Sequence, residues 1–382
     1  MLTAEWCRKR RDRLWASLRE KPDFILLSEP QHLMYFANYY ASPFVFRSQN
    51  APAMLILGAD GSSLLVVDNL MQPSAEKAHV DKFAAPVWYR SRESAAQRYE
   101  LLVKTVLDEM KTRKGDHIGI EPATYADVIA ELQTTRRRLK TTDVSSAIHQ
   151  LKRVKDPDEI AVLKRCMKAT DAGFDAAHKG FRPGMTELQA FEMVQAAAIE
   201  GAGEQVSIYG DFVSGARTEG GGGQPSSRVM EQNDLFILDF SVILYGYRSD
   251  FANTFVIAGG KPTEKQKELA QYCYEAMAVG ERQLRSGTNC KMMDTLVRNV
   301  FIMRHLEQNF THHTGHGIGL GHPDPPYITP ESTDELMAGD VVTIEPGLYV
   351  KGVGGMRFER NYFITGIGFE TLSGHSIGLE PK

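Results

Sequence analysis

The sequence predicts an α+β protein with an internally duplicated C-terminal domain and a smaller α/β domain before it. Three observations support this prediction. Helical and strand patterns alternate through residues 1–152. Residues 153–382 hold two pairs of helical patterns, and each pair is followed by strand-rich sequence. A helix-start signal lies at the junction, and the repeated helix pairs indicate an internal duplication.

The N-terminal domain is predicted from short apolar runs separated by helical periodicity. Leu14 and Leu18 share one face of an amphipathic helix, and the buried runs have the length of strands. The predicted elements are a helix over Trp6–Arg19, strands at Phe24–Leu27, Met54–Leu57 and Leu64–Val67, and a helix near Tyr125–Leu132 that follows His117–Ile120.

The boundary between the domains is predicted just after Lys152. Asp156 is a suitable helix cap, Pro157 suits the first helical turn, and Glu159 completes a capping box. The domains are therefore expected at 1–152 and 153–382.

Three further helices follow in the C-terminal domain. Capping-box pairs predict that one helix begins after Thr186 and ends near Gly201, and that another begins after Thr263. A fourth is expected from about Lys291 to Leu306. Acids that follow the two helix pairs are expected to meet near a pseudo-twofold axis.

Composition limits the classes of partner. The chain has 382 residues, 42% of them hydrophobic and 24% charged, which is typical of a globular protein of two domains. A net charge of -4 gives no reason to expect nucleic acid or an anionic membrane. Four scattered cysteines without a CxxC pair, and the lack of a signal-peptide core or a membrane-length apolar run, predict a cytoplasmic location.

Four carboxylates and one imidazole form a candidate metal-ligand set in the C-terminal domain. Four negative charges balance two divalent cations, and oxygen ligands with one nitrogen favour manganese, cobalt, iron or zinc. Two such ions can activate a shared water for attack on a carbonyl. The candidates are Asp239, Asp250, His316, Glu345 and Glu359.

Each of these residues alone has an ordinary structural explanation. An acid after a strand is usually a cap or turn residue, and Glu359 beside Arg360 suits a surface ion pair. The ordered set favours the metal site, because three members lie in distinctive settings: Asp239 ends an apolar run, His316 lies in Thr-Gly-His-Gly-Ile-Gly-Leu, and Glu345 opens Glu-Pro-Gly-Leu-Tyr.

These segments resemble the pita-bread metallopeptidases, the family of methionine aminopeptidase, aminopeptidase P, prolidase and creatinase. The resemblance also covers Leu27-Ser-Glu-Pro-Gln-His-Leu-Met-Tyr-Phe, which is similar to the prolidase and creatinase N-terminal domains. It implies a pita-bread C-terminal domain with a creatinase-like N-terminal domain. The spacing of the last three ligands is most similar to short Xaa-Pro dipeptidases. The matching C-terminal segments are 235–256, 311–326, 340–350 and 355–372.

The resemblance implies a role for each candidate ligand. Asp239 would chelate one metal, Asp250 and Glu359 would bridge two metals, and His316 and Glu345 would hold the second. Cleavage of an amide bond by a metal-bridging water is the implied reaction.

The sequence departs from the family at one position that matters for the substrate. The family commonly has a substrate-binding histidine 17 residues before the first metal Asp, and here that residue is Gly222. No histidine lies between His178 and His305, so an insertion cannot supply one. Smaller departures are Ser241, Asn253 and Arg360.

Three functions therefore stay open: an Xaa-Pro peptidase, an enzyme acting on a small non-peptide substrate such as a cyclic amide or a betaine-like molecule, and a non-enzymatic binding protein. Intact ligands favour the first, and the missing histidine favours the second. Since losing one transition-state donor typically costs 10²–10³ in rate, weak activity on Xaa-Pro dipeptides is expected. Gly222→His is expected to raise this activity, provided that the glycine run holds the ring in place.

His322 is the candidate catalytic residue. It lies six residues beyond His316 in Gly-His-Pro-Asp-Pro-Pro and is either a loop residue held by prolines or a donor to the substrate. His312 and His313 suit either a supporting role beside the metals or core packing. A homodimer is implied by the resemblance, with the segment Tyr39–Arg47 as the candidate loop bordering the partner's active site. Packing of its apolar residues inside their own domain is the alternative.

Overall fold

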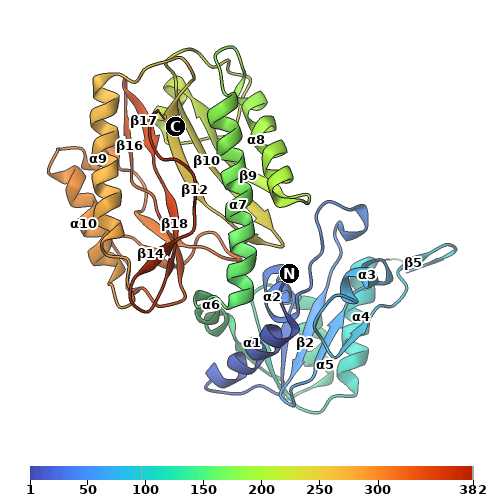
Figure 1. Ribbon diagram of the computed structural model, residues 1–382. Coiled ribbons are helices and arrows are strands. Elements are labelled where there is room, and N and C mark those ends of the chain that lie inside the picture. The colour runs from blue at the N-terminus through green and yellow to red at the C-terminus, as the bar shows by residue number, and fades with distance from the viewer. Residues whose placement is uncertain (96, 381–382) are drawn as a thin grey trace. The chain divides into compact units, whose positions relative to one another are not determined.

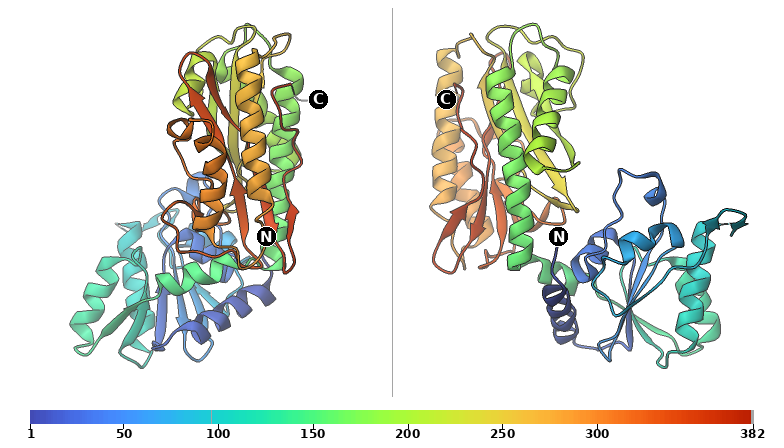
Figure 2. Two further views of the ribbon diagram at one scale, coloured as in Figure 1. Left: turned by 90° about the vertical axis from the view of Figure 1, so that its left-hand side faces the viewer. Right: turned by 45° about the vertical axis from the view of Figure 1, so that its right-hand side comes forward.

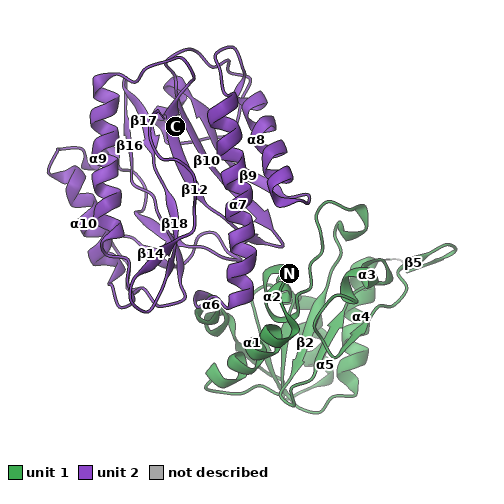
Figure 3. Ribbon diagram, in the orientation of Figure 1, with its two compact units in different colours: residues 1–152 green, residues 153–382 purple. Residues whose placement is uncertain are grey.

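The computed structural model describes residues 1–95 and 97–380, which form two compact units. Unit 1 comprises residues 1–152 and unit 2 residues 153–382 (Figure 3). Each unit has its own hydrophobic core.

A six-stranded mixed sheet forms the centre of unit 1. Strand β1 lies in its middle, antiparallel to β2 and parallel to β7, and all its residues are buried. The sheet order is β4-β3-β2-β1-β7-β8, and a separate hairpin pairs β5 with β6. The bounds are β1 Phe24–Leu27, β2 Met54–Gly58, β3 Ser63–Val66, β4 Lys82–Ala84, β5 Tyr89–Arg90, β6 Glu93–Ser94, β7 His117–Ile120 and β8 Lys140–Asp143.

Helices cover this sheet. Val106 of α4 and Val128 of α5 pack in one core cluster with residues of β1 and β2. The predicted first helix begins earlier than expected, because Thr3 caps it by accepting from Trp6 N–H at 3.3 Å. The bounds are α1 Ala4–Ser17, α2 Pro30–Ala37, η1 Phe46–Ser48, η2 Asn69–Met71, α3 Gln72–Ala75, α4 Arg98–Lys111, α5 Ala126–Thr135 and α6 Ser145–Arg153.

Two helix pairs form the helical part of unit 2, as the sequence predicts (Figure 1). Capping boxes begin α7, α8 and α9, and Asn289 caps α10 by accepting from Met292 N–H at 2.9 Å. Helix α10 is shorter than predicted, because a turn in which Leu306 N–H donates to the Phe301 carbonyl follows it. The bounds are α7 Pro157–Gly180, α8 Glu187–Ala202, α9 Glu264–Glu281 and α10 Cys290–Ile302.

Each helix pair is followed by its own sheet. The first sheet has β10 at its centre between β9 and β12, and the second has the order β14-β13-β15-β18-β19. The strands lie between the two helix pairs in Figures 1 and 2. The bounds are β9 Ser207–Ser214, η3 Gly215–Gly220, β10 Leu235–Leu244, β11 Tyr247–Arg248, β12 Phe251–Val256, η4 Glu307–Asn309, β13 Gly315–Gly317, β14 Asp324–Ile328, β15 Val341–Ile344, β16 Gly347–Val350, β17 Gly354–Arg357, β18 Arg360–Ile364 and β19 Phe369–Thr371.

Aromatic packing fixes α7 on the first sheet. Phe174 of α7 stacks on Phe240 of β10 and Phe251 of β12, with ring centroids 5.3 and 5.5 Å apart. Such buried rings contribute area and a preferred geometry. Each of these two strand residues is the direct neighbour of a candidate ligand, so this packing positions Asp239 and Asp250.

All four cysteines are buried thiols, and none of them forms a disulfide bond within the described residues. Within the described residues, no helix combines the length and apolar character that a membrane span requires.

Candidate metal centre

The first two candidate ligands come from one antiparallel strand pair. Asp239 lies in β10 opposite Ala252 of β12, and Asp250 directly precedes β12. A tight reversal at Tyr245 and Gly246, both with positive φ, returns the chain beside β10. The neighbours of Asp239 are buried, whereas Asp239 itself is partly exposed and lines a cavity.

The other three candidates come from the second half of unit 2. His316 lies in the middle of β13, Glu345 follows β15, and Glu359 lies between β17 and β18. Glu359 N–H donates to the Ala252 carbonyl at 3.0 Å, which joins this half to β12, the strand that directly follows Asp250.

Two glycines allow the close approach of strands around His316. A Cβ at Gly315 would lie 2.1 Å from the Thr343 carbonyl oxygen, and one at Gly317 would lie 2.2 Å from the Pro325 carbonyl oxygen. The Gly-His-Gly sequence is therefore a packing requirement of β13, which lies between β14 and β15.

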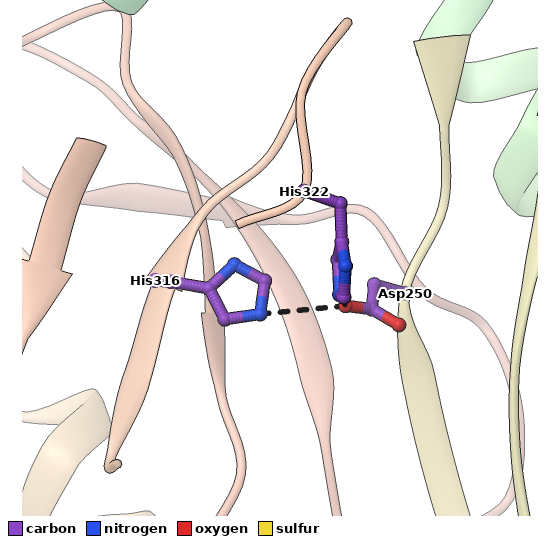
Figure 4. A group of neighbouring side chains, drawn as sticks. All are labelled: Asp250, His316 and His322. Carbon is purple, nitrogen blue, oxygen red and sulfur yellow. Dashed lines mark hydrogen bonds and ion pairs between the residues drawn. The ribbon is translucent and has the colours of Figure 1, made fainter. Parts of the chain in front are cut away.

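The donor atoms of all five candidates lie in overlapping groups. Within each group the ligand atoms are within 4.8 Å of one another: one group is Asp239, Asp250 and Glu359, a second is Asp250, His316 and His322, and a third is His313, His316 and Glu345. Figure 4 shows His316 and His322 approaching Asp250 from two sides. Because Asp250 and His316 each belong to two groups, the groups form one continuous site.

These side chains line a cavity of about 630 Å³. This volume lies within the ordinary range for small-molecule sites. Its wall also includes Tyr209, Asp211, Tyr349 and Arg357.

The four carboxylates differ in their protonation equilibria. Burial raises the pKa of Asp239 to about 7, although Arg357 opposes the shift. Burial, together with the charges of Asp250 and Glu345, holds the pKa of Glu359 well above its usual range. Protein groups alone therefore do not compensate the charge of this cluster.

Asp250 and Glu345 shift in the other direction because imidazoles face them. Burial raises the pKa of Asp250, but hydrogen bonds from His316 and His322 outweigh burial and lower it overall. Burial likewise opposes the shift of Glu345, whose pKa falls to about 2 because His313 hydrogen-bonds to it at 2.9 Å.

His316 is oriented for coordination through Nε2. Its Nδ1 donates to the Gly317 carbonyl at 2.9 Å, and because a carbonyl only accepts, Nδ1 carries the hydrogen. Nε2 lies 3.4 Å from Asp250 Oδ2 and 3.6 Å from Glu345 Oε1. Burial lowers the pKa of His316, but Asp250 and Glu345 reverse this and raise it to about 9.

The donor set fits hard divalent cations. Glu359 Oε1 is buried and has no hydrogen-bond partner among the described residues. An unpaired buried carboxylate oxygen is costly unless a cation satisfies it. Four carboxylates with one imidazole are ligands suited to manganese, iron, cobalt or zinc.

Neighbouring polar side chains hold the candidate ligands in place. Thr343 Oγ1 donates to Glu345 Oε1 at 3.2 Å and accepts from His316 N–H at 3.2 Å. Asn361 bonds both to the backbone N–H and to the carbonyl of Asp250. Such supporting contacts orient metal ligands.

The structure accounts for two of the departures from the family pattern. Ser241 Oγ donates to Asp250 Oδ1 at 3.2 Å. The Asn253 side chain exchanges two hydrogen bonds with the backbone of Gly378, at 2.8 and 3.2 Å, and so anchors the C-terminal segment. Arg360 forms a 4.0 Å ion pair with Glu281.

Sequence reasoning missed Arg357. Its guanidinium reaches Asp239, Asp211, the Tyr349 hydroxyl and the Gly221 carbonyl, with Nε 2.7 Å from Asp239 Oδ2. Burial lowers its pKa, but Tyr349 and the acids hold it well above the usual value. Arg357 stands two residues before Glu359, and alternate residues of an extended chain share a face. This spacing is a sequence signal that Arg357 belongs to the site.

His322 lies in the cavity wall, with 28% of its side chain exposed and Nε2 2.7 Å from Asp250 Oδ2. His313 contacts Glu345, and His312 Nε2 lies 2.8 Å from the Tyr349 hydroxyl. Both therefore lie next to the candidate ligands and line the cavity.

The fold and the carboxylate and histidine cluster define a metallohydrolase. The chain belongs to metallopeptidase family M24, whose model matches residues 161–366. The resemblance that the sequence motifs suggested is confirmed.

Individual relatives are distant. The uncharacterized peptidase YqhT of Bacillus subtilis is 28% identical over 280 residues, which cover 71% of this chain and 77% of YqhT. The prolidase of Pyrococcus horikoshii has a TM-score of 0.81 at 24% identity, with 98% of this chain and 100% of that chain covered. The Xaa-Pro dipeptidase of Bacillus anthracis has a TM-score of 0.83 at 24% identity, with coverage of 98% and 99%. The pita-bread fold is thereby confirmed.

Proposed function

We propose that this protein is a dinuclear metal-dependent hydrolase that cleaves an amide bond. The two ions would be held by Asp239, Asp250, His316, Glu345 and Glu359, with Asp250 and Glu359 as the candidates to serve both ions. The observation that carries this proposal is the continuous cluster of ligand atoms, which includes the buried Glu359 Oε1 that has no hydrogen-bond partner among the described residues.

The two ions, when bound, supply Lewis-acid activation of water and of the scissile carbonyl. The side chains around the two ions orient the ligands and exchange protons with the substrate. Arg357 fixes the carboxylate of Asp239 through two nitrogens, at 2.7 and 2.5 Å from Oδ2. His322, in the cavity wall, is the candidate group that donates a proton or hydrogen bond to the substrate.

Two substrate classes are supported by different observations. The likeness in fold to proteins described as a prolidase and an Xaa-Pro dipeptidase supports a dipeptide with proline in second position. The Asp211 carboxylate beside Gly222 supports a small non-peptide substrate such as a cyclic amide, because the imidazole expected there is replaced by an acceptor.

Metal stoichiometry tests the ligand assignment. Elemental analysis after loading with manganese, cobalt or zinc is expected to give two ions per chain. Asp250→Ala and Glu359→Ala are each expected to give one ion or fewer, because each removes a bridging carboxylate. Asp175→Asn, at an exposed acid of α7 (73% exposed), is the matched control and should keep two ions. Unchanged stoichiometry in both bridging variants contradicts the assignment.

Turnover separates the substrate classes. The metal-loaded enzyme is assayed on Xaa-Pro dipeptides and on small cyclic amides in parallel. A kcat/KM of about 10⁴ M⁻¹s⁻¹ or more is ordinary for an enzyme on its own substrate. Such a value for a dipeptide identifies a prolidase-like enzyme, whereas such a value for a cyclic amide alone identifies the second class.

We also propose that the protein is a cytoplasmic homodimer. The four cysteines form no disulfide bond within the described residues, which supports a reducing compartment. Phe46, which is 99% exposed in unit 1, supports an association surface on the segment Tyr39–Arg47.

A further inference from the structure

Asp211 is a carboxylate in the cavity wall that does not belong to the proposed ligand set. It lies in β9 directly opposite Asp239 of β10. Directly opposite residues of antiparallel strands project from the same face of the sheet. Asp211 therefore faces the cavity that Asp239 lines.

Two protein donors hold this carboxylate in one orientation. Gly223 N–H donates to Oδ1 at 2.8 Å, and the Arg357 guanidinium donates to Oδ2. A carboxylate has about four acceptor positions, so each oxygen keeps one of them. The Asp211 side chain is 31% exposed, which leaves these positions accessible from the cavity.

Gly222 provides the space that the Asp211 carboxylate occupies. A Cβ at Gly222 would lie 2.1 Å from Asp211 Oδ2 and 2.6 Å from Oδ1. Gly221 and Gly223 have positive φ, whereas Gly222 does not, so its own backbone conformation does not require glycine. The steric requirement comes from Asp211, and the two residues form one structural feature.

The charged side chains of η3, which lies between Asp211 and Gly222 in the sequence, have different partners. Arg217 Nη1 pairs with Glu187, and Glu219 accepts from Gly352 N–H at 3.0 Å. Neither lines the cavity. Asp211 is therefore the charged acceptor that this part of the wall presents to a substrate.

We propose that Asp211 is a specificity-determining residue whose carboxylate accepts a hydrogen bond from an N–H group of the substrate. The inference deepens the proposed hydrolase function and rests on it for the location of the substrate. An ionised carboxylate only accepts hydrogen bonds. It therefore selects a nitrogen that carries hydrogen over the same nitrogen fully methylated.

Two pairs of probes isolate this N–H group. Glycylproline is compared with N,N,N-trimethylglycylproline, which keeps the positive charge, and 2-pyrrolidone-5-carboxylate is compared with its N-methyl derivative. Calorimetric titration of the manganese-loaded full-length protein gives each dissociation constant. The N–H member of at least one pair is expected to bind about tenfold tighter or more, which is about 1.4 kcal/mol.

Three variants assign the preference to Asp211. Asp211→Leu keeps a branched side chain of similar size but removes the acceptor, and it is expected to bring the affinity ratio close to one. Gly222→Ala displaces the carboxylate without changing it and should have the same effect. Glu219→Gln, a neighbouring acid outside the cavity, should leave the ratio unchanged.

The affinity ratio distinguishes recognition from support. If Asp211 only held Arg357 in place, Asp211→Leu would weaken both members of a pair equally and leave their ratio unchanged. That result overturns the proposal, and so does a ratio near one, or no binding of any probe, in the wild type. If Asp211→Leu does not fold, the Gly222→Ala variant decides instead, and an affinity ratio that it retains also overturns the proposal. Absence of turnover with an intact ratio counts against the hydrolase assignment and not against Asp211.

Discussion

At the scale of single residues, neighbours decide what each acid of the site can do. Asp239 and Asp250 come from adjoining strands, yet their pKa values shift in opposite directions. Burial and nearby acids dominate at Asp239, whereas two imidazoles dominate at Asp250. An Asp in sequence therefore specifies a ligand type, and its surroundings specify its charge.

Gly222→His alone is not expected to create activity on Xaa-Pro dipeptides, which changes the expectation drawn from sequence. The new Cβ would lie 2.1 Å from Asp211 Oδ2, so the ring and the carboxylate cannot both keep their positions. A lower melting temperature, and a kcat/KM no higher than that of the wild type, are the expected results.

The double variant Asp211→Ala/Gly222→His removes this clash. It should recover stability relative to the single variant and show the higher dipeptide activity of the two. Equal stability of Gly222→His and the wild type would show that the loop moves aside, and would contradict the steric coupling.

At the scale of elements, the C-terminal segment completes the packing of α7 against the first sheet. The His375 ring packs against both Phe174 of α7 and Phe251 of β12, with centroids 4.6 and 4.5 Å away. Its Nε2 donates to the Ala252 carbonyl at 3.1 Å. Burial lowers the pKa of His375 to about 3, with Arg360 and His178 adding to the shift and the Ala252 hydrogen bond opposing it.

This buried histidine predicts a loss of stability in mild acid. Between the folded pKa of about 3 and the ordinary value of 6.5, the unfolded chain binds a proton that the folded chain does not. The free energy of unfolding therefore reaches its full value, as far as His375 is concerned, above about pH 6.5, and it falls as the pH decreases below that value. For His375 alone the loss from pH 7 to pH 5 is roughly 2 kcal/mol.

The measurement is urea unfolding at several pH values for the wild type and His375→Phe. The variant is expected to have the shallower slope of unfolding free energy between pH 7 and pH 5, whatever its absolute stability. His305→Gln, at an exposed histidine, is the control and should keep the wild-type slope. Parallel slopes for all three proteins would contradict the prediction.

At the scale of the whole molecule, the candidate site is confined to one unit. All five proposed ligands and His322 belong to unit 2, while unit 1 has its own sheet and core. The exposed Phe46 of unit 1 has no role within that core, and it is the feature that association would bury.

The homodimer prediction is tested by sedimentation equilibrium at micromolar concentration. A mass of twice that of the chain is expected, since closed twofold dimers are the commonest oligomers. Phe46→Ser should shift the equilibrium toward the monomer, because it removes the exposed ring. Phe369→Ser, at a partly exposed aromatic of unit 2 (40%), is the matched control. A monomeric wild type would exclude the proposal.

The sequence by itself determined the features that short-range physics specifies. Capping residues set the starts of α7, α8 and α9, and apolar periodicity set the strand and helix types, because these signals act within a few residues. The fold class, the family and the five candidate ligands all follow from local sequence motifs.

Only the tertiary structure decided which side chains face one another. Asp211 lies opposite Asp239 through the register of β9 and β10, and Arg357 reaches both from a strand more than a hundred residues later. Such proximity depends on strand register and packing between distant segments, which no local pattern encodes. The same is true of Gly222, because the steric requirement for glycine there comes from the Asp211 carboxylate of a different strand.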